Sequence, residues 1–577
     1  MPREIITIQV GQCGNQIGCR FWELALKEHS CYNPRGLFDD ALSSFFHNVD
    51  RRFDPPLELP VGDGRGMIRF LKARAVLIDM EEGVVKELLK GSLGELFDSR
   101  QYITDMSGSG NNWAHGHEVY GPQYKDSILE SVRREAEGCD SLQSFFMLHS
   151  LGGGTGSGVG TYVMEQLHDE YPEVYRFSAC VFPSADDDVV TSPYNSMLAV
   201  ASLAENTDCV LPIENQALIE ITRNYSSSSS SSSSSRTSRG GLNPSCLAAA
   251  AAAGGRRGTG RQGERGGGGC AQRTGHSPSA MATGRGVYAA GSSSLPSSLH
   301  ENRCSHVDGN HGHTSQRQMA GGKPWDDMNG VAASLLLDLT CSVRFEGSLN
   351  VDMNEITMNL VPYPRLHFLV SSMSPLLGGQ APPSPSLPAS AGAFAAAGRT
   401  QPSFSSSSSS SANSKAIDIL FSEVFSWKNQ LIKADPCSST YLACALTLRG
   451  SPTSCTISDM NRNIARIKNR LNMVYWNAPE GFKVGLCSKP PVGLPYSLLC
   501  LCNNCCVSDT FTNIKDRFSK LFKRGMFLHH YTKYMEPASF EDSLETLETL
   551  IADYQSLQWA QPPPTVPRLH PIISTFK

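Results

Sequence analysis

The sequence lacks the features of a secreted or membrane-spanning protein. No apolar core follows a basic start within residues 2 to 11, and no apolar stretch is long enough to cross a bilayer. The 577 residues carry a formal net charge of only −5, so charge gives no reason to expect nucleic acid or an anionic membrane as a partner. We therefore expect a soluble protein of the cytoplasm.

The sequence also lacks the cysteine spacing of a disulfide framework or a metal site. It has 18 cysteines, many of them inside apolar runs, which is typical of reduced core residues. Cys500, Cys502, Cys505 and Cys506 end one such run and have no distant cysteine pair at matching spacing. We interpret these four as residues of a buried strand.

The most informative stretch, 141–160, predicts a buried strand, a glycine turn and the start of a helix. Its glycine cluster, Gly152 to Gly158, would let the backbone approach a ligand, and the free amides of a helix start favour phosphate. No lysine lies between His149 and Asp169, which excludes a P-loop. A phosphate here would have to be held by backbone amides and hydroxyls.

Companion loops of the same kind follow other predicted strands. Strands alternating with helices predict an α/β fold with a doubly wound, mostly parallel sheet, in which ligands bind beyond the carboxyl ends of the strands. Several glycine-rich or acidic loops at one edge favour nucleotide binding over ordinary structural turns. The predicted strands, each with the loop that follows it, are Ile5–Val10 with 11–18, Ala73–Ile78 with 79–83, and Phe177–Phe182 with 183–188, and the loop 107–113 precedes a helical stretch, 117–137.

Composition divides the chain into five parts. A nucleotide-binding domain (1–224) precedes a serine-, alanine- and glycine-rich insertion (225–322) with too few large apolar residues to fold. Residues 323–345 predict a buried central helix. The part 346–506 predicts a smaller α/β domain with a second insertion expected to be disordered, 378–414, and the last part, 507–577, predicts C-terminal helices.

Three loop motifs together resemble the tubulin superfamily: GQCGNQIG at 11–18, SGSGNNWA at 107–114 and GGGTGSG at 152–158. Two later stretches, VPYPRLHF at 361–368 and FLHHY at 527–531, resemble eukaryotic tubulins. Within the superfamily the chain resembles the epsilon isotype most, and the delta isotype is the nearest alternative. The resemblance covers nearly everything outside the two insertions and implies a tubulin-like fold, with a GTPase domain, a central helix, a second domain and a C-terminal helical hairpin.

The resemblance also implies a site for GTP or GDP with Mg²⁺. Asp79 and Glu81 would order Mg²⁺ and its waters, and Asn111 would contact the phosphate end. Ser192 stands where the family usually has glutamate, which predicts a weakened ribose contact. The remaining contacts would be Gly11, Gln12, Cys13 and Gln16 with the phosphates and base, Ser150, Gly153, Gly154, Thr155 and Gly156 with the α- and β-phosphates, Asp188 near the ribose, and Asn215, Trp325 and Asn329 with the guanine.

A second implied site lies on an acidic helix that contains Asp352 and Glu355. In tubulins GTP lies between stacked subunits, and such a helix of the next subunit completes the site. The resemblance therefore implies that Glu355, with Asp352 beside it, acts in trans and orients or deprotonates the attacking water. The alternative is an ordinary solvated carboxylate on a helix surface.

Three functions follow from these residues. The resemblance implies a GTP-binding structural subunit of microtubules, acting at centrioles and basal bodies with alpha-, beta- or delta-tubulin and centriolar proteins, and a GTPase only when assembled. A regulatory or scaffold tubulin that builds no lattice is the alternative, because the insertion 378–414 occupies the position of the loop that makes lateral contacts. A nicotinamide-dependent dehydrogenase would fit the glycine loops alone, but no acidic residue follows the first loop at the usual ribose-binding distance.

Overall fold

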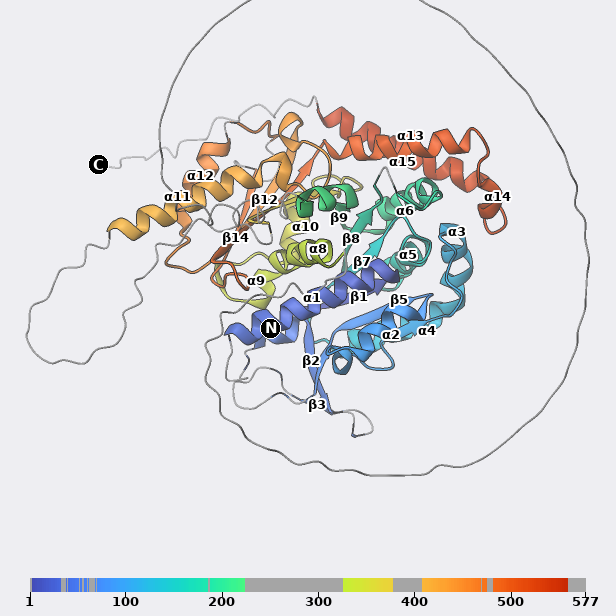
Figure 1. The fold of residues 1–577 in the computed structure, drawn as a ribbon, viewed down its shortest axis with the longest axis horizontal. Coiled ribbons are helices and arrows are strands. Elements are labelled where there is room, and N and C mark those ends of the chain that lie inside the picture. Colours follow the sequence, from blue (N-terminus) through green and yellow to red (C-terminus); the bar gives the residue numbers. More distant parts are fainter. Residues whose placement is uncertain are drawn as a thin grey trace, which may run out of the picture. The chain divides into compact units, whose positions relative to one another are not determined.

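The computed structural model describes the chain on both sides of its insertions (Figure 1). The predictions of disorder for 225–322 and for 378–406 lie outside the described residues. Among the described residues, no helix is long and apolar enough to span a bilayer. The described residues are 3–32, 38, 40–50, 52–53, 57–59, 61, 68, 70–184, 187–223, 325–376, 407–468, 470–474 and 481–558.

A six-stranded parallel sheet carries the glycine loops and confirms the predicted doubly wound architecture. All its strands run in one direction, so their carboxyl ends meet at one edge. The central strands are buried on both faces and therefore read as continuous apolar runs. The strand order is β6 (Tyr102–Thr104), β5 (Ala75–Asp79), β1 (Glu4–Val10), β7 (Leu142–Ser150), β8 (Tyr175–Phe182) and β9 (Cys209–Glu214).

Helices cover both faces of this sheet. Successive residues of a strand point to opposite sides, and in β1 the residues on both sides are buried. On β1, Ile5 joins a cluster with Trp22 of α1, whereas Ile6 and Ile8 join another with Val132 of α4. The covering helices are α1 (Gly11–Tyr32), α2 (Glu82–Lys90), α4 (Gly121–Glu137), α5 (Gly160–Glu170), α6 (Ser192–Asn206) and α8 (Asp326–Leu339).

Two predictions about this domain were wrong in detail. The expected loop 11–18 is helical from Gly11 onward, and Gly14 permits close packing, since a Cβ there would lie 2.0 Å from the Leu148 carbonyl oxygen. The expected strand at 73–78 is divided between two sheets at Arg74. Ala73 ends β4 (Leu71–Ala73), which belongs to a three-stranded sheet with β2 (Phe46–Asp50) and β3 (Leu57–Leu59).

The division at Arg74 follows from the hydrogen bonds of that residue. Its backbone pairs with Phe45 on one side and Thr7 on the other, so it joins the two sheets. Its guanidinium donates to the Ser43 and Gly138 carbonyls at 3.0 and 2.6 Å. A buried arginine needs such partners, and these partners are distant in sequence.

The second domain is built on a five-stranded sheet. Helix α11 begins at Ser407, so the predicted disorder of 378–414 was too wide at its C-terminal end. Cys500 and Cys502 lie in a buried strand as predicted, whereas Cys505 and Cys506 are buried in the turn that follows this strand. No group of three or more candidate metal ligands occurs among the described residues. The strand order is β10 (Gly347–Leu349), β13 (Phe482–Cys487), β12 (Tyr441–Gly450), β14 (Tyr496–Asn504) and β11 (Leu369–Ser374), and the helices are α9 (Cys341–Arg344), α10 (Met353–Leu360), α11 (Ser407–Val424) and α12 (Ile457–Lys468).

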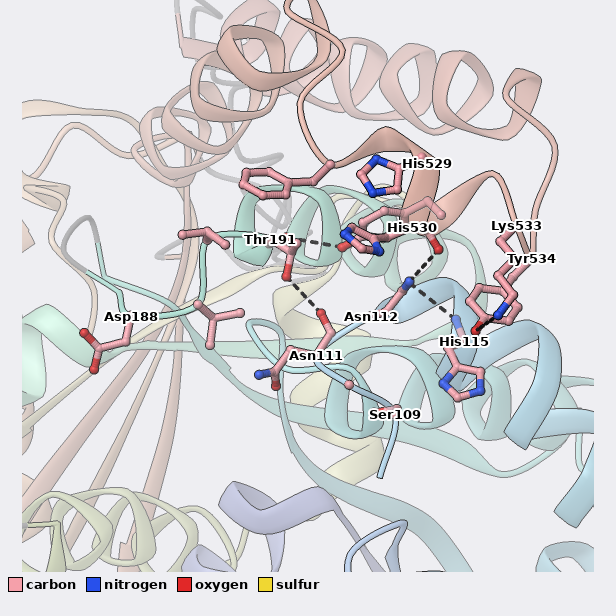
Figure 2. Close-up of a pocket in the computed structure, with 15 residues that line it drawn as sticks. Ser109, Asn111, Asn112, His115, Asp188, Thr191, His529, His530, Lys533 and Tyr534 are labelled. Carbon is pink, nitrogen blue, oxygen red and sulfur yellow. Dashed lines mark hydrogen bonds between the residues drawn. The ribbon is translucent and has the colours of Figure 1, made fainter. Parts of the chain in front are cut away.

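The last helices pack on the first domain. Helices α13 (Val507–Phe522) and α15 (Ala538–Gln558) contact each other and α6. The short helix α14 (Leu528–Tyr531) lies beside α3 (Trp113–His115), where the Asn112 amide donates to the His530 carbonyl at 2.9 Å (Figure 2). The C-terminal segment therefore contacts the loops at the carboxyl edge of the parallel sheet.

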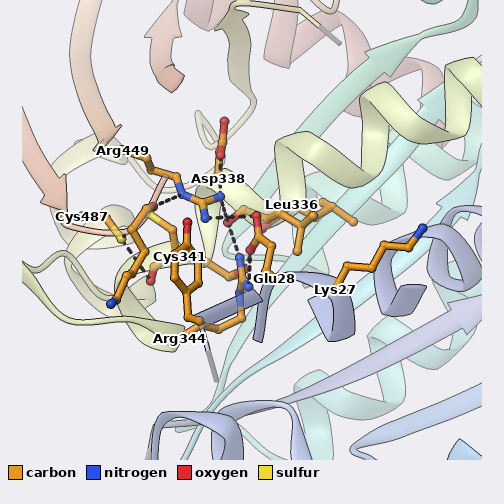
Figure 3. A network of polar contacts seen from close by, with 12 residues as sticks. Lys27, Glu28, Leu336, Asp338, Cys341, Arg344, Arg449 and Cys487 are labelled. Atoms are coloured by element: carbon orange, nitrogen blue, oxygen red, sulfur yellow. Dashed lines mark hydrogen bonds and ion pairs between the residues drawn. The ribbon is translucent and has the colours of Figure 1, made fainter. Parts of the chain in front are cut away.

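A buried ionic cluster joins the two domains (Figure 3). Glu28 of α1 accepts from Arg344 of α9 at 2.6 Å and from Arg449 of β12 at 3.0 Å. Arg449 also donates to Asp338 of α8 at 2.8 Å. All four residues are buried. The positive charges of two buried guanidinium groups are therefore compensated by two carboxylates that lie on other helices.

We expect Glu28→Gln to lower the free energy of unfolding by about 3 to 5 kcal/mol, because it leaves a buried positive charge uncompensated. Urea unfolding of the full chain measures the change. Glu23→Gln is the control, since Glu23 lies on the same helix with its side chain 40% exposed, and it should change stability by less than about 0.5 kcal/mol. If both variants lost the same free energy of unfolding, the buried cluster would not be the cause of the loss in Glu28→Gln.

Candidate nucleotide site

The loops at the carboxyl edge are packed so closely that only glycine fits at their contacts. Gly11 has φ +74°, and a Cβ on it would lie 3.0 Å from the Gly156 nitrogen. A Cβ on Gly154 would lie 2.5 Å from the Asn112 nitrogen. The structure therefore brings the predicted residues of three separate motifs together in one place.

The side chain of Asn195 in α6 connects two of these loops by hydrogen bonds. Its amide nitrogen donates to the Asn111 and Gly152 carbonyls at 2.9 and 2.8 Å. Its oxygen accepts from the Trp113 amide at 2.9 Å and from the Tyr531 hydroxyl at 2.6 Å. We did not predict this role, because all four partners of Asn195 are distant in the sequence.

His149 at the end of β7 is a second residue that the prediction missed. Its Nδ1 lies 2.7 Å from the Gly156 carbonyl oxygen, and its Nε2 lies 2.8 Å from the Ser178 hydroxyl. Burial lowers the pKa of His149 to about 4, so the ring is neutral at physiological pH. Since a carbonyl only accepts, Nδ1 carries the proton and ties the glycine loop to β8.

The acidic pair Asp79 and Glu81 fits a cation. Asp79 is buried, and its Oδ1 accepts from the Glu81 amide at 3.2 Å. Its Oδ2 has no hydrogen-bond partner among the described residues, and burial raises the pKa of Asp79 to about 6. An unpartnered buried carboxylate oxygen is costly, and Mg²⁺ takes one or two carboxylates together with phosphate and water.

The predicted guanine contacts lie mainly between α1 and α8. Gln16, Trp325 and Asn329 line one cavity of about 440 Å³. Trp325 is 53% exposed, which leaves a ring face free for stacking. The structure does not place Asn215 among the residues that line this cavity; Asn215 begins the helix after β9 and is half-buried.

Asn111 and Asp188 line a different cavity, of about 730 Å³ (Figure 2). Asn111 has φ 53°, and its carbonyl accepts from the Thr191 hydroxyl at 2.9 Å. Asp188 is exposed at this cavity. Ser192 is fully buried, and its hydroxyl has no partner among the described residues.

The other predicted phosphate and base contacts differ in their exposure. Gln12 is exposed and Ser150 is half-buried, whereas Thr155 is buried and its hydroxyl lies 3.0 Å from that of Ser109. Burial raises the pKa of the Cys13 thiol to about 12, so this thiol stays neutral. Gly153 lies near both Asn111 and Ser150, because a Cβ on it would be 3.7 Å from the Asn111 Oδ1.

The acidic helix α10 lies at the opposite edge of the parallel sheet. The Asp352 carboxylate accepts from the Glu355 amide at 2.8 Å and lies 3.5 Å from the guanidinium of Arg3, which precedes β1. Glu355 lies 3.2 Å from Lys483 and is 42% exposed. Gly11 follows the other end of β1, so that strand alone separates the two edges by about 20 Å.

His117 supports the loop that contains Asn111. Its ring stacks on Trp113 at 4.3 Å, and its two nitrogens lie 2.9 Å from Glu118 and 3.4 Å from Glu165. Burial opposes the charged form, but the two carboxylates outweigh it and raise the pKa of His117 above its ordinary value of 6.5.

This pKa predicts a dependence of stability on pH. A raised pKa means that the charged imidazole stabilises the fold fully below pH 6.5 and loses this contribution as the pH rises through the folded pKa. The loss of free energy of unfolding in His117→Gln should therefore be larger at about pH 6 than at about pH 8. His168→Gln, at an exposed position on α5, is the control. A loss that does not vary with pH would contradict the expectation.

Comparison with known proteins agrees with this arrangement. The profile of the Tubulin/FtsZ family, GTPase domain, matches residues 4–223, and the Tubulin C-terminal domain matches residues 399–516. The tubulin epsilon chain of Mus musculus is 45% identical over 572 residues, which is 98% of each chain, and that of Homo sapiens is 44% identical over 575 residues, also 98% of each. The tubulin beta-2 chain of Suillus bovinus is 30% identical over 568 residues, 97% of each chain.

The two matched domains contain the structures described above. The GTPase profile covers the parallel sheet with its glycine loops, and the C-terminal profile covers α11, β12 to β14 and part of α13. A GTPase domain of this family implies binding of GTP or GDP. The chain belongs to the tubulin family, and it is more similar to the tubulin epsilon chains than to the beta chain named above.

Proposed function

We propose that this chain is a GTP-binding microtubule subunit of the cytoplasm that acts in the organisation of centrioles, basal bodies and cilia, with other tubulin subunits and centriolar proteins as partners. One observation carries the proposal: the glycine loops and the acidic helix α10 lie at opposite edges of one sheet. A subunit built in this way holds nucleotide on one face and presents Glu355 on the other. Stacked subunits then complete each other's sites.

In this proposal the loops hold the phosphates through amides and the hydroxyl of Ser150. Trp325 stacks on the guanine, and Asn329, which lines the same cavity, offers it both a hydrogen-bond donor and an acceptor. Asp79 and Glu81 would hold Mg²⁺, which would supply positive charge to the phosphates. The buried Ser192 offers no carboxylate to the ribose, so Asp188 would be the acidic residue near the sugar.

Hydrolysis would be completed by the neighbouring subunit. Glu355 of that neighbour orients water for attack on the γ-phosphorus and accepts its proton, while the bond from that phosphorus to the GDP oxygen breaks. Asp352 is the N-cap of α10, so it positions the helix, and Glu355 is the residue whose side chain is 42% exposed. The contact with Lys483 sets the direction of that carboxylate.

The alternative is a regulatory or scaffold tubulin, of the delta type or another divergent type, that binds GTP without building a lattice. The long insertion at the position of the lateral loop supports this alternative. Electron microscopy of the chain mixed with alpha- and beta-tubulin separates the two functions. Incorporation along the microtubule wall supports the structural subunit, and binding only at ends or on the surface supports the scaffold.

We expect the purified chain to bind GTP, and NAD should not compete with it. Trp325→Ala should weaken GTP binding by about tenfold, because a stacked aromatic ring contributes roughly 1 to 1.5 kcal/mol. Competition of the two nucleotides against a fluorescent GTP analogue measures this. Trp427→Ala removes a similarly exposed indole on another surface, 62% exposed, and should leave affinity unchanged. Preferential binding of NAD would instead support the dehydrogenase.

We expect Glu355→Ala to lower GTP turnover of co-assemblies by about 100-fold or more, the usual effect of losing a group that activates water. GTP binding by the isolated variant should be unchanged, because α10 lies far from its own glycine loops. Phosphate release from assemblies with alpha- and beta-tubulin measures turnover. Glu346→Ala removes another exposed carboxylate of the second domain and serves as the control, and unchanged turnover in Glu355→Ala would refute the role in trans.

A further inference from the structure

The end of α13 and the turns that follow it are strongly basic. Residues 515–535 contain six lysines or arginines and one acidic residue, Asp516. Two of the six cations have partners: Lys515 lies 3.5 Å from Glu548, and Arg517 donates to the Ser184 carbonyl at 3.1 Å. The other four, which we name the basic ridge, are Lys520, Lys523, Arg524 and Lys533.

No carboxylate among the described residues forms an ion pair with any member of the basic ridge. All four side chains are exposed. The amino group of Lys533 makes its one described hydrogen bond to the Tyr534 hydroxyl, at 3.2 Å. Cations near a helix C-terminus offset the helix dipole, which accounts for Lys520, Lys523 and Arg524 at the end of α13. Lys533 also follows a helix, α14, but that helix has only four residues and therefore a small dipole.

One member of the basic ridge, Lys533, lines the cavity of about 730 Å³ that lies between α14 and the loops (Figure 2). Lys533, His529 and His530 line this cavity, and all three are exposed. Phe527 and Tyr534 add aromatic surface to the same wall. Asp188 is the one carboxylate in the lining. The surface therefore combines cations, hydrogen-bonding groups and a hollow that is lined in part by aromatic and aliphatic side chains.

The charges around the basic ridge favour a short ligand. Helix α15 contacts α13 and exposes Glu541, Asp542, Glu545 and Glu548. A long polyanion such as RNA that crossed α15 would meet these carboxylates and be repelled. A short acidic segment can stay on the basic ridge and place one apolar side chain in the cavity.

We propose that the basic ridge and the adjoining cavity form a docking site for an acidic peptide segment, rich in glutamate or aspartate and with an apolar residue, of a partner protein. The basic ridge contains no residue that the proposed function assigns to GTP or to hydrolysis, although Asn111 and Asp188 line the adjoining cavity. Charge complementarity supplies attraction from a distance, and the cavity supplies specificity for the apolar residue.

Fluorescence anisotropy with a labelled peptide of glutamates around one phenylalanine tests the site in the full chain. Replacing all four residues of the basic ridge by glutamine should weaken binding at least about tenfold, because four exposed ion pairs together amount to roughly a factor of ten or more. Binding should also weaken as salt rises from about 50 to about 150 mM. A peptide with glutamines in place of the glutamates should not bind.

A matched control separates the basic ridge from net charge. The quadruple variant Lys27→Gln, Lys86→Gln, Arg133→Gln and Arg462→Gln removes the same charge from other exposed sites, with side chains 49 to 58% exposed, and should bind the peptide as the unaltered chain does. Changing the three lysines of the basic ridge to arginine keeps their charge and should preserve binding. This variant shows whether a loss of binding in the glutamine variant comes from the lost charge or from a disturbed fold. GTP affinity should be the same in all variants.

Three results would overturn the proposal. One is equal loss of binding in the two glutamine variants. Another is tighter, ridge-dependent binding of a single-stranded RNA or of phosphatidylserine vesicles, which would assign the surface to nucleic acid or membrane. The third is failure of the unaltered chain to bind the acidic peptide. Loss of GTP binding without loss of peptide binding would count against the proposed function only.

Discussion

The close approach of three backbone segments at one sheet edge is the constraint on which the rest of the structure depends. At Gly154 and Gly11 a single added carbon would lie 2.5 to 3.0 Å from a neighbouring backbone atom. Because no side chain intervenes, amide groups from distant parts of the chain come together. The side chains of Asn195 and His149 then hold these segments through hydrogen bonds that pair all of their polar atoms. The loops are therefore fixed by contacts within the chain.

Helix α1 connects this edge to the second domain. The helix begins at Gly11, and near its other end Glu28 accepts hydrogen bonds from two arginines of the second domain. At 1.5 Å per residue, this is a rigid connection of about 25 Å. The buried cluster is costly to desolvate, but it specifies one relative placement of α1, α8, α9 and β12, because any other placement would leave a buried charge unpaired.

The parallel sheet, the alternation of strands and helices, and the gathering of glycine loops were predictable. They rest on local patterns: apolar runs of strand length, glycine clusters after them and helical spacing beyond. The buried cysteines of β14 were predictable for the same reason. The exposed Trp325 and its neighbours Gln16 and Asn329 were predicted from motifs, and the structure brings these three to one cavity. The roles of Asn195 and His149 were not predictable, since each depends on partners far away in the sequence.

The sequence by itself determined most of the strands and helices and the positions of the glycine loops, because these properties depend on neighbours along the chain. Only the tertiary structure decided that Ala73 and Ala75 belong to different sheets, that Glu28 pairs with Arg344 and Arg449, and that α10 lies at the edge opposite the glycine loops. Each of these outcomes is a long-range pairing, set by burial and charge compensation between residues that no local pattern relates.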